Sequence, residues 1–310
     1  MAPLLIALGW LVLVPEPAAA WGPATHIALG NMVLGALYLI PPAIRTLIER
    51  YPLDFLYGSI AADISFAKKY VPEGRHCHQW SIGEEILDAA DSDRLRAVGY
   101  GYLAHLAADT VAHNVFVPRQ LLLTSTTQAL GHTYWEHRMD LHLGNDFLKQ
   151  ARTLVVENDH SDADALFDEV LSRTMFSFTT NRRIFRGMIR FTGHDRWHRI
   201  FEQVLAKSRF DLPDPVVDQY FELAFERVIN YLDARADSDT AQMDPIGEVN
   251  LKLAKMVRRR ALSDPATDHP DALIEMADAF FPFPEGSPNP AVRRVARSRV
   301  SGPPGPETDA

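Results

Sequence analysis

The 310-residue sequence has a single cysteine, Cys77, which excludes an intrachain disulfide and a cysteine-based zinc module. It also lacks a basic surplus: 31 Lys and Arg residues stand against 40 Asp and Glu residues, and the formal net charge is −9. A general nucleic-acid binder needs cations to neutralise phosphates, so no stable nucleic-acid complex is expected. Alternating β-branched runs are missing as well, so few or no strands are expected. The sequence also has no Gly-rich phosphate loop and no internal repeat.

Apolar residues are plentiful, at 47% of the chain, and they recur at the helical period over most of its length. We predict an all-α, multi-helix fold. Its two long helices are expected over residues 94–117, capped by residues 91–93 and closed by Pro118, and over residues 126–155. Further helices are expected at 163–176, 197–206, 215–235 and 248–262.

The two ends of the chain differ in composition from the middle. Residues 4–14 are an apolar run followed by Ala18-Ala19-Ala20, which is typical of a secretory signal and too short for a membrane span. We therefore predict a signal peptide at 1–20, a mature chain that begins at Trp21, and export to the periplasm or the medium. Residues 283–310 are rich in Pro, Gly, Ser and Arg and are predicted to be a disordered tail, which leaves one helical domain at 21–282.

His105, Asp109 and His113 recur every four residues, so a helix places all three on one face. The residues between them are almost all Ala, Leu and Val, and a helix normally buries such a face. Burying polar groups without partners is costly, so the face needs either a hydrogen-bond network or a metal ion. All three side chains can coordinate a metal, and we interpret the face as a metal site.

Other potential ligands accompany this face. His132 and Glu136 share the four-residue spacing, and Asp63 lies near the end of an expected helix. A loop offers His76 and His78, of which His78 is preferred because an aromatic residue follows it two positions later. Histidine and carboxylate groups are the ligands that zinc accepts where no thiolate is present.

These motifs, together with Trp21-Gly22-x-x-x-His26 and Ala62-Asp63, resemble the zinc-dependent phospholipase C family. That family shares its fold with single-strand-specific fungal nucleases and is similar to the amino-terminal domain of glycosylphosphatidylinositol-specific phospholipase D. The matching pieces extend from Trp21 to about residue 143. The resemblance implies a helical fold with three zinc ions in a cleft.

The resemblance also implies which residues hold each ion. The three sets are Asp63, the loop histidine, His105 and Asp109; the amino group and carbonyl of Trp21 with His26 and the shared Asp109; and His113, His132 and Glu136. The chain departs from the family pattern in one place: relatives usually separate the aspartate and the next histidine by six residues, whereas Asp109 and His113 are four apart.

The predicted function is zinc-dependent phosphodiester hydrolysis of the phospholipase C type. Zinc would generate hydroxide from a bound water for attack on phosphorus, and Asp63 would orient or deprotonate that water. The expected partner is a phospholipid or another phosphodiester, with transient contact to a membrane surface. Alternatives are a nuclease or nucleotidase, which the Trp21-to-His26 spacing favours, phospholipase D-type cleavage, and a non-catalytic zinc-binding surface or lipid-docking protein.

Overall fold

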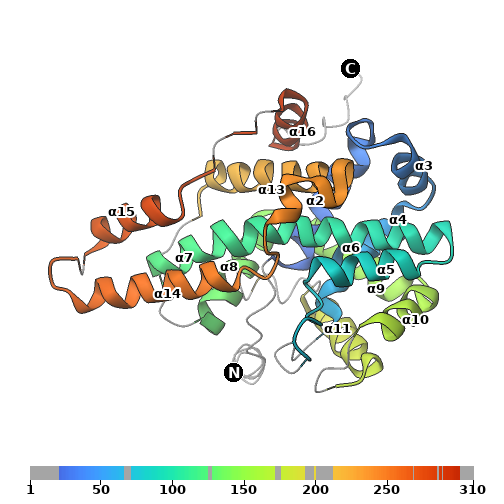
Figure 1. Cartoon of the computed structure of the whole chain (residues 1–310), viewed down its shortest axis with the longest axis horizontal. Coiled ribbons are helices and arrows are strands. Elements are labelled where there is room, and N and C mark those ends of the chain that lie inside the picture. Colours follow the sequence, from blue (N-terminus) through green and yellow to red (C-terminus); the bar gives the residue numbers. More distant parts are fainter. Residues whose placement is uncertain are drawn as a thin grey trace.

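The computed structural model describes residues 21–65, 71–124, 128–171, 176–192, 199, 212–267, 269–284, 286–287 and 289–300, without the side chains of 128–133, 192 and 297–300. Over these residues the fold is helical and contains no strand, which confirms the predicted fold class (Figure 1). The predicted signal peptide at 1–20 lies outside the described residues, as does almost all of the predicted helix at 197–206.

Helices follow one another along the described chain. In chain order they are α2 (Pro23–Gly35), α3 (Pro42–Arg50), α4 (Pro52–Ala61), α5 (Trp80–Ala89), α6 (Asp93–Val111), α7 (Val117–Thr124), α8 (Gln128–His142), α9 (Asn145–Glu157), α10 (Ser161–Val170), α11 (Phe178–Thr192), α13 (Asp214–Ala234), α14 (Glu248–Ser263), α15 (Pro270–Phe280) and α16 (Pro290–Val300). Short 3-10 turns lie at η1 (Leu37–Leu39), η2 (Ala62–Ile64), η5 (Arg235–Asp237) and η6 (Asp239–Gln242). No described helix is both long enough and apolar enough to cross a membrane.

Helix α6 is the central helix of the structure. Ser92 caps its first turn by accepting a hydrogen bond from the Leu95 amide at 3.3 Å, as the 91–93 segment predicts. Over residues 97–111, every residue except Tyr100 is buried. A helix buried all round needs partners on every side, and α6 packs against α4, α5 and α13 (Figure 1).

Helices α4 and α6 approach each other closely because each has a glycine at the contact. A Cβ on Gly58 would lie 2.0 Å from the carbonyl oxygen of Val98, and a Cβ on Gly101 would lie 2.0 Å from the carbonyl oxygen of Phe55. In both cases the obstacle is backbone, which cannot rotate away. The crossing therefore requires glycine at both positions.

Replacing Gly101 by alanine should lower the free energy of unfolding by about 1–3 kcal/mol, because the added methyl group forces the two helices apart. Gly187 in α11 is the matched control: it is also a helical glycine, but a Cβ there meets nothing within 4 Å. Gly187→Ala should be neutral or stabilising by up to about 1 kcal/mol. Urea unfolding measures both, and equal stabilities of the two variants would contradict the close crossing.

The predicted end of the central helix at Pro118 is wrong. A π-helical turn, η4 (Ala112–Phe116), follows α6, and the chain continues as α7 to Thr124. Proline has no amide hydrogen and its ring collides with the carbonyl four residues earlier in a regular α-helix. A wider π turn just before Pro118 accommodates the ring, so the chain continues instead of stopping.

The predicted single helix over 126–155 is also wrong, because the chain breaks into α8 and α9. Gly144 stands between them with a φ of 88°, a backbone conformation that favours glycine and interrupts a helix. The Gly144 amide closes the end of α8 by donating to the carbonyl of Leu141 at 3.1 Å.

The structure also departs from the predicted disorder of residues 283–310, because residues 290–300 form α16. Val292 and Ala296 lie four residues apart on this helix and are buried, and α16 packs against α13. Just before it, the Ser287 amide donates to Glu222 at 2.6 Å. Composition averaged over the whole tail hides this short apolar stripe. Residues 301–310 lie outside the described part.

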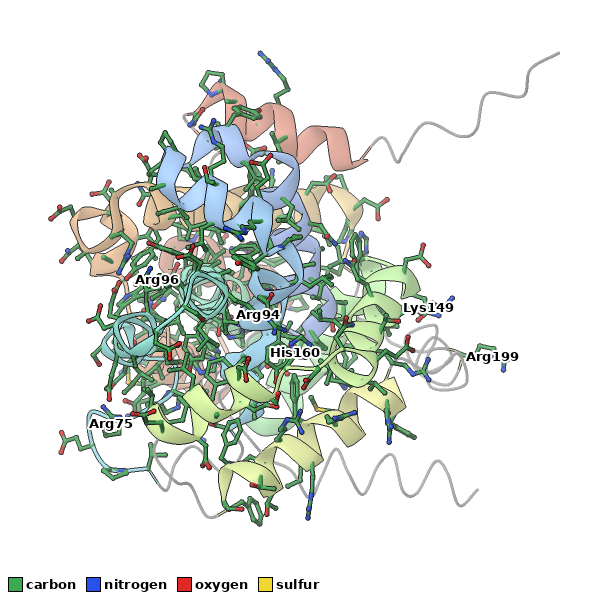
Figure 2. All side chains as sticks on the ribbon, turned by 90° about the vertical axis from the view of Figure 1, so that its right-hand side faces the viewer. Arg75, Arg94, Arg96, Lys149, His160 and Arg199 are labelled. Carbon is green, nitrogen blue, oxygen red and sulfur yellow. The ribbon has the colours of Figure 1, made fainter. Side chains whose placement is uncertain are left out.

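A group of polar contacts joins α10 to the core on the face shown in Figure 2, where Arg94 and His160 are labelled. Arg94 of α6 donates to Asp54 Oδ1 of α4 at 2.8 Å and to the carbonyl of Asp159 at 3.1 Å. His160 is buried, and its ring stacks on Tyr57 with 3.7 Å between centroids. His160 therefore serves packing, in line with its lack of ligand-spaced partners in the sequence.

Candidate metal centre

Histidine and aspartate side chains from α2, η2, the 71–79 loop, α6 and η4 converge around Asp109. The ring nitrogens near its carboxylate are His78 Nε2 at 3.0 Å, His105 Nε2 at 3.2 Å, His26 Nε2 at 3.4 Å and His113 Nδ1 at 3.9 Å. Asp63 joins the group through Oδ1, which lies 3.5 Å from His78 Nε2. The side chain of Asp63 is 13% exposed, whereas that of Asp109 is completely buried.

The donor atoms around Asp109 fit a metal ion. Neither carboxylate oxygen makes a well-aligned hydrogen bond within the described part of the chain. His78 Nε2 and His105 Nε2 also face each other at 3.2 Å. A buried carboxylate costs several kcal/mol unless positive charge compensates it. Two sets of ligand atoms, one from His26, His105 and Asp109 and one from Asp63, His78 and His105, each lie within 4.8 Å of one another, so each set could hold an ion of the kind that accepts nitrogen and oxygen ligands.

The opposite nitrogen of His105 fixes how that ring is protonated. His105 Nδ1 lies 2.9 Å from the carbonyl oxygen of Ser59, which follows Gly58 in α4. A carbonyl only accepts, so Nδ1 donates its proton to Ser59, which makes Nε2 the nitrogen that a metal ion would bind. The close crossing of α4 and α6 thus supplies the group that orients a candidate ligand.

Protonation of the apo site also suits metal binding. Burial by itself raises the pKa of Asp109, but the charge of His105 and the close approach of the His105, His26 and His78 rings outweigh it and hold that pKa well below its ordinary value. Burial lowers the pKa of His26 below 6.5, and the nearby His105 lowers it further. An ionised carboxylate beside a neutral imidazole is the state in which both groups coordinate metals.

The two histidines of the 76–78 loop have different positions. His78 directs Nε2 at Asp109, whereas His76 accepts a hydrogen bond from the backbone amide of His78 at Nδ1, at 3.1 Å. Cys77, absent from the predicted ligands, has its sulfur 3.3 Å from His78 Nδ1, on the other side of that ring. The ligand atoms of the three residues lie within 4.8 Å of one another, so they could also hold an ion.

The predicted third ligand set is described in part. His113 lies in η4 beside Asp109, and its Nδ1 is 2.6 Å from the carbonyl oxygen of Pro245. Glu136 of α8 is buried. His132 belongs to α8 as well, but its side chain lies outside the described residues. Joint binding of an ion by His113, His132 and Glu136 therefore stays a prediction.

Trp21, the predicted mature N-terminus, is buried rather than trailing in solvent. Its indole ring lies 6.2 Å from the ring of Phe116 in η4 and 6.3 Å from that of Phe221 in α13. Shortly after it, the His26 ring stacks on His105 with 3.8 Å between centroids. The start of the described chain is therefore packed at the metal centre.

Asp140, also absent from the predicted set, fastens this segment to α8. Its carboxylate accepts hydrogen bonds from the amides of Ala24 and Thr25 at 3.2 and 3.0 Å and from Thr25 Oγ1 at 2.7 Å. A Cβ on Gly22 would come within 2.1 Å of it. Burial raises the pKa of Asp140 to about 7, although these hydrogen bonds act in the other direction. Asp140 lies four residues after Glu136, so the four-residue spacing of the candidate ligands could have identified it from the sequence.

The fold and the site together define an all-helical protein with a buried histidine–carboxylate centre suited to metal ions. Residues 25–181 match the zinc dependent phospholipase C family, and the chain belongs to this family. The matched region covers every predicted side-chain ligand from His26 to Glu136 and begins after Trp21. No curated protein and no solved structure matches the chain significantly.

Asp109→Asn should remove most of the stabilisation that zinc gives, because asparagine keeps the shape of the side chain and lacks its charge. Zinc at 100 times its Kd stabilises a folded protein by about 2.7 kcal/mol per ion. Asp54→Asn is the control, since Asp54 is also buried but pairs with Arg94. Melting temperatures with zinc and with chelator test this, and an unchanged zinc effect in Asp109→Asn would contradict the centre.

Proposed function

We propose that the protein is a zinc-dependent phosphodiester hydrolase that cleaves phospholipids in the manner of a phospholipase C. The observation that carries the proposal is the buried Asp109 carboxylate, which lies within 3.0–3.4 Å of the Nε2 atoms of three histidines and makes no aligned hydrogen bond among the described residues. Membership of the zinc dependent phospholipase C family supports it.

Three ligand sets would hold up to three ions, with Asp109 shared between the first two. They are Asp63, His78, His105 and Asp109; the amino group and carbonyl of Trp21 with His26 and Asp109; and His113, His132 and Glu136. When bound, zinc supplies positive charge that lowers the pKa of a water molecule and offsets the negative charge on the phosphoryl and leaving oxygens.

Asp63 is the residue that we assign to proton transfer. Its side chain is 13% exposed, while those of His78 and Asp109 are completely buried, so water reaches the centre most readily from the Asp63 side. The Asp63 carboxylate would accept the proton of the water that attacks phosphorus and orient the oxygen lone pair for in-line attack. The inaccessible Asp109 holds the histidines in place.

A phospholipid substrate is favoured over a nucleic acid. The family supports it, and the net charge of −9 does not favour a polyanionic partner. The Trp21-to-His26 spacing, which suits the nuclease relatives, keeps a single-strand nuclease or nucleotidase as the second candidate. A further alternative is phospholipase D-type activity, in which the same centre would cleave the other ester bond of the phosphodiester.

Asp63→Asn should lower turnover by about 10²–10⁴-fold, because the amide cannot accept the proton. Binding of phosphatidylcholine vesicles should not change. Asp162→Asn is the control, since the Asp162 side chain is 71% exposed and lies outside the centre. Zinc content is measured in the same samples, so that loss of metal and loss of the base are distinguished.

Three products separate the candidate functions in this assay. Phosphocholine release supports a phospholipase C, phosphatidic acid indicates a phospholipase D, and degradation of single-stranded DNA without lipid cleavage indicates a nuclease. A wild-type protein that binds zinc and vesicles but turns over none of these substrates would be a docking protein, and the proposed hydrolase would be rejected.

We further propose that the protein is exported and that its signal peptide is removed directly before Trp21, so that a ligand amino group is created by cleavage. The signal-like sequence at 1–20 and the buried position of Trp21 support this. A protein with Gly-Ser added before Trp21 should bind one zinc ion fewer than the protein that starts at Trp21. Elemental analysis and intact mass measure this, and equal zinc content would contradict the role of the amino group.

A further inference from the structure

Residues 243–245 present three consecutive carbonyl groups to side chains of the metal-binding half of the chain. Trp80 Nε1 donates to the carbonyl of Met243 at 2.8 Å, and Asn114 Nδ2 donates to that of Asp244 at 2.8 Å. The carbonyl of Pro245 lies 2.6 Å from His113 Nδ1. We call residues 243–247 the carbonyl loop.

The carbonyl loop determines which nitrogen of His113 is available for a metal. Because a carbonyl only accepts, the contact with Pro245 places the proton of His113 on Nδ1 and leaves the lone pair on Nε2. His105 is held in the same way, because its Nδ1 lies 2.9 Å from the carbonyl oxygen of Ser59. Metal-binding histidines regularly donate their other nitrogen to a carbonyl or carboxylate in this way.

The loop also limits where the backbone of His113 can lie. Gly247 has a φ of 62°, and a Cβ there would lie 2.4 Å from the His113 carbonyl oxygen and 2.5 Å from its Cβ. The neighbouring Asn114 accepts a hydrogen bond from Asn250 of α14 at 2.9 Å. Contacts from the loop and from the start of α14 therefore surround the π turn that carries His113.

We propose that the carbonyl loop is the positioning element for His113: it holds the ring by Nδ1 and so directs Nε2 toward a third ion. This inference rests on the proposed zinc function. It gives a role in the site to residues outside the region 25–181 that matches the family. His113 lies in a π turn four residues after Asp109, and contacts from a segment 132 residues further along the chain fix its direction.

The test compares two glycine variants by zinc titration of the full mature chain. Gly247→Ala pushes a methyl group against the backbone of His113, so the affinity for one ion should fall by about 10- to 100-fold while the other ions stay bound. Gly144→Ala is the matched control, because Gly144 has a φ of 88° and a Cβ there meets nothing within 4 Å. With a ψ of 168°, the Gly144 backbone is at least as unfavourable for alanine as the left-handed helical backbone of Gly247, and the variant should keep every ion at wild-type affinity.

Asn114→Ala is a second variant that does not depend on strain. It removes the amide that donates to Asp244 and should weaken binding of the same single ion, while the other ions keep wild-type affinity. Wild-type affinity for all ions in both Gly247→Ala and Asn114→Ala would overturn the inference. So would a loss of all ions together, which indicates general unfolding.

The same titration distinguishes this inference from the proposed function. If the wild-type chain binds no zinc, the proposed function fails. If the wild-type chain binds its ions and hydrolyses lipid while the loop variants match it in zinc affinity, only the positioning role fails. Turnover of Gly247→Ala should fall through kcat with little change in KM, because the variant weakens an ion that would supply charge to the reaction and leaves the lipid-binding surface unchanged.

Discussion

Asp109 carries a negative charge on a fully buried side chain, and much of the structure serves to keep it there. Three histidine Nε2 atoms lie within 3.4 Å of its oxygens, and together they hold its pKa far below the ordinary value. Removing a carboxylate from water costs several kcal/mol, so this position is tolerated only with positive charge or a metal ion close by. This costly buried carboxylate is thus the one that two ions would share in the proposed site.

The packing of the core and the orientation of the ligands have a common origin. Gly58 and Gly101 allow the backbones of α4 and α6 to touch, which gives the two helices their tight contact. The same approach brings the carbonyl of Ser59 to His105 Nδ1 and settles which nitrogen faces Asp109. A loss of packing at this crossing would therefore disturb ligand geometry as well as stability.

Interactions within one helix could be predicted from the sequence, whereas contacts between distant segments could not. The four-residue spacing of His105 and Asp109 places them together because helix geometry alone decides it. The preference for His78 over His76 depends on the path of a loop. The carbonyl of Pro245 has no sequence signature at all, since every residue has one. Gly144 was a readable signal for a break between α8 and α9.

Residues beyond the family match contact the candidate metal centre, so the matched half of the chain is incomplete by itself. Phe221 of α13 covers one side of Trp21, whose amino group is a ligand in the proposed site. Pro245 orients His113, and the ring of Trp80 stacks on Tyr231 of α13 at 4.0 Å between centroids. Without these contacts, buried aromatic rings would face water and His113 would lose its acceptor, so the ligands and the later helices must fold as one unit.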